Sequence, residues 1–214
     1  MKVGIIGSGA VGQTLAKAFK SEGYEVILGT RNPAKAEVVK FNTETGIDIG
    51  TFDETAKFGG LLVLCTKGGA AQEALTLAGI ENLNGKVIID TTNPIAPLPP
   101  TNGVLRYTTT LDNSLMEQLQ QFTPEAKFVK AFSSVGNNLM YKPALQGGKP
   151  TMFICGNDEA AKQTVTQILD SFGWETEDSG KAEAARAIEP LCMLWCIQGF
   201  LKNDWNYAFK VLRP

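Results

Sequence analysis

The sequence predicts an α/β fold in which helices cover both faces of a mostly parallel sheet. Short apolar runs alternate along the chain with stretches whose apolar residues recur at helical spacing. A glycine-rich turn joins the first apolar run to the first helical stretch. One run, Leu61–Leu64, is apolar at every position, which is typical of a strand covered on both faces. Together these observations predict a doubly wound sheet.

The first unit of this fold is a strand, a helix and a second strand. Residues 2–6 are largely apolar and predict the first strand. Apolar residues at helical spacing from Val11 to Phe19 predict the helix, and Gly23 is typical of the residue that follows a helix end. Tyr24–Leu28 predicts a second strand, parallel to the first.

The turn between the first strand and helix matches the G-x-G-x-x-G pattern of Rossmann-type dinucleotide-binding folds. It reads Gly7-Ser8-Gly9-Ala10-Val11-Gly12. In this pattern one glycine makes the tight turn, one lets the backbone approach the pyrophosphate, and one allows close packing of the helix. We therefore expect a dinucleotide whose pyrophosphate lies at the helix N-terminus.

The end of the second strand indicates which dinucleotide binds. NAD sites usually place an acidic residue about 20 residues after the glycine turn, whereas this chain reads Gly29-Thr30-Arg31-Asn32 there. Thr30 offers a hydroxyl, Arg31 a fork of donors and Lys35 a further positive charge. These groups favour the 2′-phosphate of NADP. Pro33 is predicted in the first turn of the next helix.

The middle of the chain continues the alternation. We expect a helix over 34–41, a weak strand over 47–50, a short segment over 53–57, a helix over 70–78 and a strand over 86–90. Cys65-Thr66-Lys67 and Thr92-Asn93-Pro94 follow the two strongest strands. Since ligands of open α/β sheets bind at the carboxyl ends of strands, both loops are expected to face the dinucleotide.

Residues 95–110 form the longest irregular stretch and contain three prolines. Loops of this length are often functional lids, and a simple surface excursion is the alternative.

The last third predicts a small C-terminal lobe that ends in a long helix. The expected elements are a helix over 114–121, strands over 127–132, 151–155 and 174–176, and helices over 158–172 and 181–202. We divide the chain into an NADP-binding domain, residues 1–148, and a lobe, residues 149–214, packed on it. The two parts can also count as one domain.

Composition excludes several classes of function. The net charge of -2 argues against a nucleic-acid partner. The chain has no histidine, so a Ser-His-Asp triad or a histidine metal site is impossible. The four cysteines show no C-x-x-C pair and are typical of reduced, buried residues. No metal site is expected, although Cys192 and Cys196 lie at helical spacing.

The chain is also expected to be a cytoplasmic protein without a membrane partner. The first strand follows Met1-Lys2 directly, which leaves no room for a signal peptide. The apolar run Leu191–Ile197 is too short to span a bilayer. This run either closes the core or forms the interface of a homodimer.

Several segments resemble the coenzyme F420-dependent NADP oxidoreductases, whose oxidoreductase domain is also similar to the cytosolic part of the six-transmembrane metalloreductases. The segments are GSGAVGQTLA, VILGTRNPAKA, KVIIDTTNP, VKAFSSVGNN, PTMFICGNDEAAKQTV, EPLCMLW and AFKVL. They span nearly the whole chain.

The resemblance implies roles for individual residues. Ser8–Val11 would hold the pyrophosphate, Thr66, Ala70 and Asn93 would line the groove, and Asn137 would lie near the nicotinamide. Tyr207 would contact a second ring between the loop 133–138 and the C-terminal segment. Archaeal members carry a histidine where this chain has Ser133. The cofactor-binding candidates are Gly7, Ser8, Gly9, Ala10, Val11, Gly12, Thr30, Arg31, Asn32, Lys35, Cys65, Thr66, Lys67, Ala70, Thr92, Asn93, Pro94, Ala131, Phe132, Asn137 and Tyr207.

These features together predict an NADP-dependent oxidoreductase that moves hydride between NADPH and a small-molecule acceptor, a deazaflavin such as coenzyme F420 or a flavin. No catalytic residue is assigned, because the cofactors carry the chemistry. One alternative is a hydroxyacid or imino-acid dehydrogenase that uses Lys142 and Asn138. Another is a non-catalytic NADP sensor that lacks a second ring site.

Overall fold

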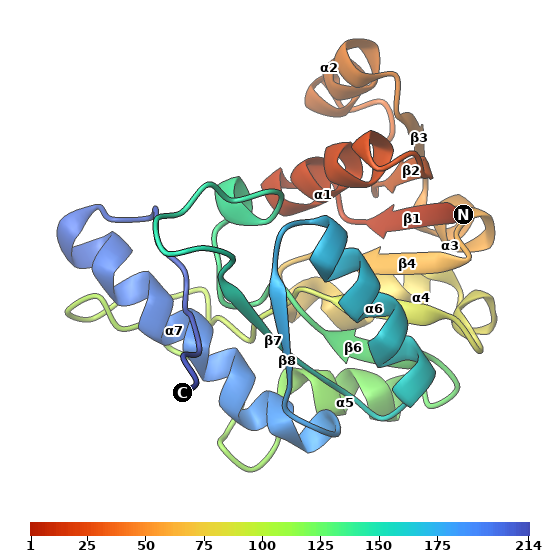
Figure 1. Ribbon diagram of the computed structural model, residues 1–214. Coiled ribbons are helices and arrows are strands. Elements are labelled where there is room, and N and C mark those ends of the chain that lie inside the picture. The colour runs from red at the N-terminus through yellow and green to blue at the C-terminus, as the bar shows by residue number, and fades with distance from the viewer.

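The protein is built on one eight-stranded sheet with the order β3-β2-β1-β4-β5-β6-β7-β8 (Figure 1). A computed structural model describes all residues, 1–214. The strands are β1 (Lys2–Ile6), β2 (Glu25–Gly29), β3 (Asp48–Gly50), β4 (Leu61–Leu64), β5 (Val87–Asp90), β6 (Lys127–Lys130), β7 (Thr151–Gly156) and β8 (Glu175–Asp178). Strands β1 to β6 pair in parallel, and β7 is antiparallel to β6. The predicted Rossmann-type, mostly parallel sheet is therefore confirmed.

Helices cover both faces of this sheet (Figure 1). They are α1 (Ala10–Ser21), α2 (Ala36–Thr45), α3 (Phe52–Phe58), α4 (Ala71–Ala78), α5 (Leu115–Phe122), α6 (Glu159–Ser171) and α7 (Ala185–Lys202). Side chains of α1, α2 and α6 join one core cluster of 28 buried residues. Side chains of α3, α4, α5 and the start of α7 join a second cluster of 20. The sheet thus has two separate apolar cores, as its fully buried strands require.

The strand order reverses between β1 and β4, where a doubly wound sheet opens a crevice for ligands. The loops that follow these strands touch there. The Cys65 amide donates to the Ile6 carbonyl over 2.8 Å. Gly7 has a φ of 128°, and a Cβ at this position would lie only 2.6 Å from the Cys65 carbonyl oxygen. A glycine is therefore required for the chain to turn at the crevice.

Two helices begin later than the sequence pattern predicts. The helix expected over 34–41 is α2, Ala36–Thr45, so Pro33 lies before the helix and not in its first turn. The reason is a local turn, in which the Ala34 amide donates to Asn32 Oδ1 over 3.1 Å. The final helix, expected from residue 181, opens with a 3₁₀ turn at Ala182–Ala184.

Residues 149–214 continue the same sheet. Strand β7 pairs with β6, and β8 pairs with β7, while α7 crosses the edge of the molecule (Figure 1). The C-terminal segment returns to the sheet, where the Thr151 amide donates to the Phe209 carbonyl over 2.8 Å. The division at residue 148 stays a prediction.

The irregular segment 95–110 packs along α7. It contains only isolated bridges, such as Ile95 with Tyr107. The Tyr107 hydroxyl donates to the Glu189 carbonyl over 2.7 Å. Gly103 approaches Leu201 so closely that a Cβ would lie 3.0 Å from its Cγ. These contacts attach the segment to α7, and whether it acts as a lid stays a prediction.

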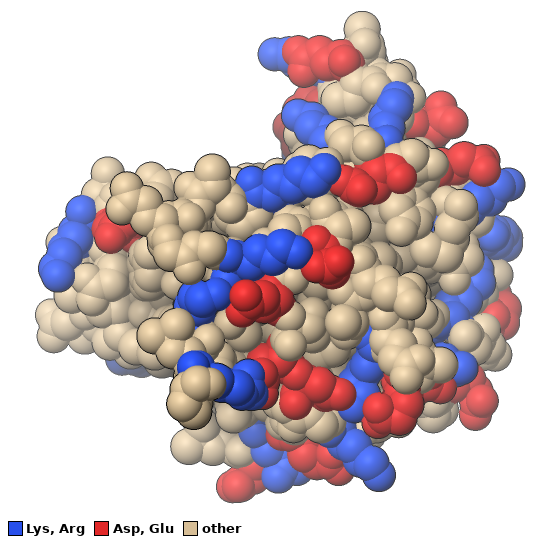
Figure 2. Space-filling view, viewed as in Figure 1, with Lys and Arg blue, Asp and Glu red and all other residues tan.

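The surface mixes both signs of charge on the face shown in Figure 2, with no extended basic patch. A membrane crossing would need a longer apolar helix than any in the structure. Within Leu191–Ile197, Trp195 and Cys196 are buried in this chain, whereas Leu194 is half exposed. The homodimer stays a prediction.

An ion pair between Glu117 of α5 and Arg186 of α7 should make the stability of the protein depend on pH. Glu117 accepts hydrogen bonds from Arg186 Nη2 at 2.6 Å and from the Ser114 amide at 2.8 Å. The contact with Arg186 lowers the pKa of Glu117 to about 2. Since the folded-state pKa lies below the unfolded value of about 4.3, this stabilisation is complete above that value and is lost as the pH falls towards 2.

We therefore expect the melting temperature to fall between about pH 4.3 and 2, and Glu117→Gln to make that fall shallower. Thermal unfolding, followed by circular dichroism at several pH values, measures how the melting temperature of each protein changes with pH. Glu44→Gln, which removes an exposed pair with Lys40 at 3.7 Å, is the control and should keep the wild-type slope. An unchanged slope in Glu117→Gln would contradict the assignment.

Candidate functional site

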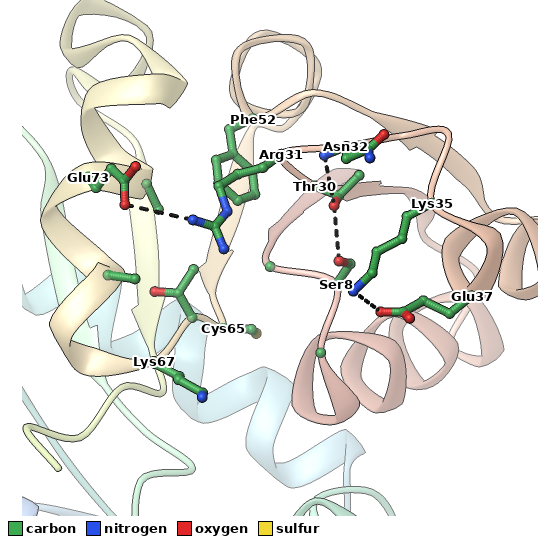
Figure 3. Close-up of a pocket in the computed structure, with 15 residues that line it drawn as sticks. Ser8, Thr30, Arg31, Asn32, Lys35, Glu37, Phe52, Cys65, Lys67 and Glu73 are labelled. Carbon is green, nitrogen blue, oxygen red and sulfur yellow. Dashed lines mark hydrogen bonds and ion pairs between the residues drawn. The ribbon is translucent and has the colours of Figure 1, made fainter. Parts of the chain in front are cut away.

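A cavity of about 490 Å³ opens at the carboxyl ends of β1, β2 and β4 (Figure 3). It lies at the reversal of strand order, where a doubly wound sheet binds its ligand. Eleven of the predicted residues line it: Gly7, Ser8, Gly9, Thr30, Arg31, Asn32, Lys35, Cys65, Thr66, Lys67 and Ala70. Residues from three separate loops are thereby brought together.

The floor of the cavity is the glycine turn that leads into α1. Gly9 is the N-cap of α1 and offers no side chain to its first turn, whose N–H groups have no partner within the helix. A Cβ built on Gly9 would meet no atom within 4 Å, so this side of the turn is open. Gly12 is the opposite case, because a Cβ there would lie 1.8 Å from the Gly7 carbonyl oxygen. One glycine therefore leaves room for a ligand and the other for helix packing.

One end of the cavity carries positive charge. Ser8 Oγ donates to Thr30 Oγ1 over 3.1 Å, which joins the glycine turn to the end of β2. Arg31 reaches Glu73 at 3.9 Å and Lys35 reaches Glu37 at 2.6 Å (Figure 3). All four of these charged side chains are more than half exposed. Exposed pairs of this kind are weak, so both cations are available to an anionic ligand.

From the cavity wall at Thr66 onwards, the ends of β4, β5 and β6 carry buried polar atoms without a partner. They are Thr66 Oγ1, Asn93 Oδ1 and Ser133 Oγ. The Asn93 side-chain amide already donates to the Ser133 carbonyl over 2.8 Å, which leaves only its oxygen unpaired. Buried polar atoms are nearly always hydrogen-bonded, because leaving one unpaired costs about 1–3 kcal/mol. Three such atoms on adjacent strand ends indicate a polar ligand.

The remaining predicted residues lie around these two regions. Ala10, Val11 and Gly12 form the start of α1. Thr92 and Pro94 are buried on either side of Asn93.

Four predicted residues from the second half of the chain do not line the cavity. Ala131 and Phe132 are buried in the core, and Phe132 has a φ of 59°, a conformation rare for a bulky residue. Asn137 lines a separate cavity of about 320 Å³, where its amide contacts Thr14 Oγ1 at 3.3 Å. Tyr207 stacks on Trp195 with ring centroids 5.8 Å apart. Their roles in binding stay predictions.

The sequence analysis missed four residues that line the cavity: Glu37, Phe52, Glu73 and Ala74. Glu73 lies three residues after Ala70 and so falls on the same helical face, which was a usable signal. Phe52 follows β3 at the carboxyl edge of the sheet, where the rule that located the other loops also applies.

Cys65 lines the cavity but is not a nucleophile. Burial raises the pKa of its thiol to about 12, so the thiol stays protonated at neutral pH. The four cysteines are all unpaired and buried, and no cluster of three acidic or cysteine residues could hold a metal ion.

Comparison with known proteins agrees with this geometry. Residues 2–94 match the family model for coenzyme F420-dependent NADP oxidoreductases. The crystal structure of a "putative F420 dependent NADP-reductase" from Arthrobacter sp. FB24 is 33% identical, aligns over all of both chains and superposes with a TM-score of 0.93. This chain belongs to the F420-dependent NADP oxidoreductase family. As a member of that family it is an NADP-dependent oxidoreductase.

More distant proteins share parts of this architecture. Metalloreductase STEAP3 of Rattus norvegicus is 26% identical over the whole of this chain, which spans 43% of the length of that protein. A reductive aminase of Aspergillus terreus, solved with NADPH and ethyl levulinate, is 18% identical with a TM-score of 0.67. The aminase covers 94% of this chain and shows a shared fold only. Nearly the whole of this chain thus has a counterpart in larger proteins.

Substitution by alanine is expected to have opposite effects at Gly9 and at Gly12. Gly9→Ala should leave the melting temperature close to that of the wild type and weaken dinucleotide binding, because its Cβ points into open space where a ligand approaches. Gly12→Ala should lower the melting temperature by several degrees, because its Cβ collides with the Gly7 carbonyl. Calorimetric titration with NADPH and thermal unfolding measure both effects. Equal loss of stability in the two variants would contradict this division of roles.

Proposed function

We propose that the protein transfers hydride between NADPH and a deazaflavin of the coenzyme F420 type, or a related flavin. The bound nicotinamide supplies the hydride chemistry, and the protein supplies binding, orientation and exclusion of water. Family membership supports the NADP half of this proposal. The Arthrobacter relative, a "putative F420 dependent NADP-reductase", supports the deazaflavin half.

The residues around the cavity fit NADP. The open face of Gly9 and the N-terminus of α1 suit a pyrophosphate. Arg31, Lys35 and the Thr30 hydroxyl suit a 2′-phosphate. In the absence of a phosphate, Glu37 and Glu73 pair with the two cations. A phosphate carries more charge than either carboxylate and can replace both pairs.

The observation that carries the proposal is the set of unpartnered atoms on Thr66, Asn93 and Ser133. A nicotinamide carries a carboxamide, which both donates and accepts hydrogen bonds. Asn93 Oδ1 can accept from it, while the two hydroxyl groups can donate or accept. None of these three side chains titrates near neutral pH, so they can bind and orient the ring but cannot act as a general acid or base.

For the acceptor ring we propose the region beside Ser133, between the loop 133–138 and the C-terminal segment. These segments are joined by Asn138 Nδ2, which donates to Asn206 Oδ1 over 2.9 Å. Trp195 lies against Gly136 and supplies an apolar wall. Serine is smaller than the histidine that archaeal relatives carry, so this position would restrict an acceptor ring less than histidine does. Four free cysteines support a cytoplasmic location.

The identity of the dinucleotide is tested by Arg31→Ala. We expect this variant to bind NADPH about tenfold or more weakly and to bind NADH as the wild type does, because only NADPH has a phosphate for Arg31 to bind. Isothermal titration calorimetry measures both affinities. Lys40→Ala, an exposed charge on α2 that does not line the cavity, is the matched control. If the wild type shows no preference for NADPH, the assignment of Thr30 and Arg31 is wrong.

The acceptor is tested by following NADPH oxidation at 340 nm with coenzyme F420, flavin mononucleotide or flavin adenine dinucleotide. We expect turnover with the deazaflavin and slower or no turnover with the flavins. Ser133→His should change the relative rates of these acceptors, and calorimetry with NADPH separates this change from any effect on dinucleotide binding. Tight NADPH binding without turnover of any acceptor would favour the non-catalytic sensor instead.

A further inference from the structure

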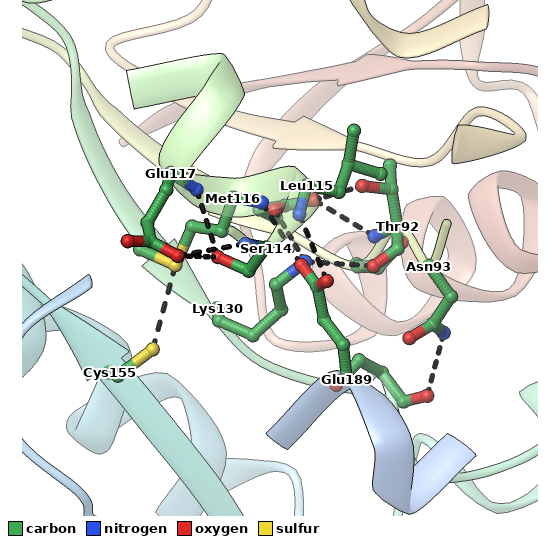
Figure 4. A network of polar contacts seen from close by, with 12 residues as sticks. Thr92, Asn93, Ser114, Leu115, Met116, Glu117, Lys130, Cys155 and Glu189 are labelled. Atoms are coloured by element: carbon green, nitrogen blue, oxygen red, sulfur yellow. Dashed lines mark hydrogen bonds and ion pairs between the residues drawn. The ribbon is translucent and has the colours of Figure 1, made fainter. Parts of the chain in front are cut away.

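The side chain of Lys130 is completely buried beneath the loop that carries Asn93 (Figure 4). Its ammonium lies 2.7 Å from Asp90 Oδ2 and 2.9 Å from Glu189 Oε1. These two carboxylates are also buried. Burial lowers the pKa of Lys130, but the charges of Asp90 and Glu189 outweigh it, so the pKa is raised and the ammonium stays charged. The hydride transfer proposed above makes no direct use of this group.

The buried cluster forms hydrogen bonds with three atoms of one residue, Thr92. Lys130 Nζ donates to the Thr92 carbonyl over 2.8 Å. Asp90 Oδ1 accepts from the Thr92 amide at 2.9 Å and from its hydroxyl at 2.7 Å. The Thr92 carbonyl belongs to the peptide group that joins Thr92 to Asn93. Lys130 therefore fixes the peptide plane from which Asn93 extends.

Asn93 is held from its other sides as well. Its side-chain amide donates to the Ser133 carbonyl, and its backbone carbonyl lies so close to Gly68 that a Cβ there would be 2.1 Å away. Only Asn93 Oδ1 is left without a partner. The side chain is thus fixed with a single acceptor presented to a ligand.

Glu189 extends the same cluster to two helices. It is on α7, and its carboxylate accepts from the amides of Leu115 and Met116, each at 3.0 Å, at the N-terminus of α5 (Figure 4). The cluster therefore joins β5, β6, α5 and α7 through one ammonium. Displacement of any of these elements would move the Thr92 carbonyl and the side chain that follows it.

We propose that Lys130 is a positioning residue for hydride transfer, which holds Asn93 Oδ1 where it receives a hydrogen bond from the nicotinamide carboxamide. This inference rests on the proposed function and assigns a residue that does not touch the cofactor. Small errors in the placement of a reacting ring reduce rates strongly, by up to about 10²-fold for a displacement near 1 Å. A group that fixes the ring through Asn93 should therefore affect kcat more than KM.

A double-mutant cycle separates this role from a purely structural one. Lys130→Met alone and Asn93→Ala alone should each slow single-turnover hydride transfer from NADPH to coenzyme F420 by about tenfold or more. If Lys130 acts through Asn93, Lys130→Met should change the rate of the Asn93→Ala protein by less than about twofold. Stopped-flow absorbance measures the rates, and calorimetry measures NADPH affinity on the same proteins.

Lys162→Met provides the matched control. Lys162 is also a buried lysine, and it pairs with Asp178 at 2.8 Å and Glu159 at 3.0 Å, on α6 and β8 and away from Asn93. This variant loses two ion pairs of a buried lysine whose partner carboxylates are partly exposed, and it should keep the wild-type rate of transfer. If Lys130→Met does not fold, Lys130→Arg replaces it in the cycle, because it keeps the positive charge between the carboxylates and changes the donor that reaches the Thr92 carbonyl.

Two outcomes would overturn the inference while leaving the function intact. The first is a double variant whose rate is lowered by the product of the two single-variant factors, which would mean that Lys130 and Asn93 act independently. The second is a Lys162→Met protein that slows transfer as much as Lys130→Met does. A wild-type protein that binds NADPH and transfers no hydride to any acceptor would instead overturn the proposed function, and the positioning role with it.

Discussion

The architecture depends on one buried positive charge. An ammonium enclosed by protein is tolerated only when carboxylates pair with it and its remaining donors are used. Lys130 meets this requirement with Asp90 from the neighbouring strand, Glu189 from the last helix and the Thr92 carbonyl. The loop at the end of β5 therefore depends on the packing of α7 against the sheet, because Glu189 of α7 pairs with the lysine that binds the Thr92 carbonyl. This contact makes residues 149–214 part of the structure that shapes the nucleotide half, whichever way the domains are divided.

The glycine turn imposes a second constraint on the opposite side of the cavity. Gly12 lets α1 pack against the turn at a distance that no side chain would allow, and Gly7 does the same for the loop after β4. These close approaches place the N-terminus of α1 between a cationic end near Arg31 and a neutral polar end near Asn93. The two ends differ in charge, so under the proposed function the 2′-phosphate of NADP is expected at the cationic end and the nicotinamide at the neutral end. Backbone geometry and charge would then orient the dinucleotide independently of the reacting ring.

Much of the fold and most of the cavity follow from local patterns in the sequence. Leu61–Leu64 is β4 with the same bounds as predicted, and the loops after β1, β2 and β4 line the cavity as the strand-end rule requires. Local patterns failed where a contact joins distant parts of the chain. Neither the pairing of Arg31 with Glu73 nor that of Lys130 with Glu189 has a sequence period, because each depends on how helices pack on the sheet. The late start of α2 has a local cause, the Asn32 turn, which competes with the preference of Pro33 for a first helical turn.

Larger proteins share the architecture of nearly the whole chain. The metalloreductase STEAP3 matches the whole of this chain with 43% of its own length, and the aminase shares the fold over 94% of it at 18% identity. The same fold thus occurs in proteins of different description, so the fold by itself does not determine the hydride acceptor. Under the proposed function, the acceptor would be selected by side chains beside the nicotinamide. The candidates are the loop at Ser133, where one buried hydroxyl lacks a partner, and the aromatic segment around Tyr207. Because Lys130 lies in β6, directly before that loop, the buried cluster would also hold the base of the proposed acceptor region.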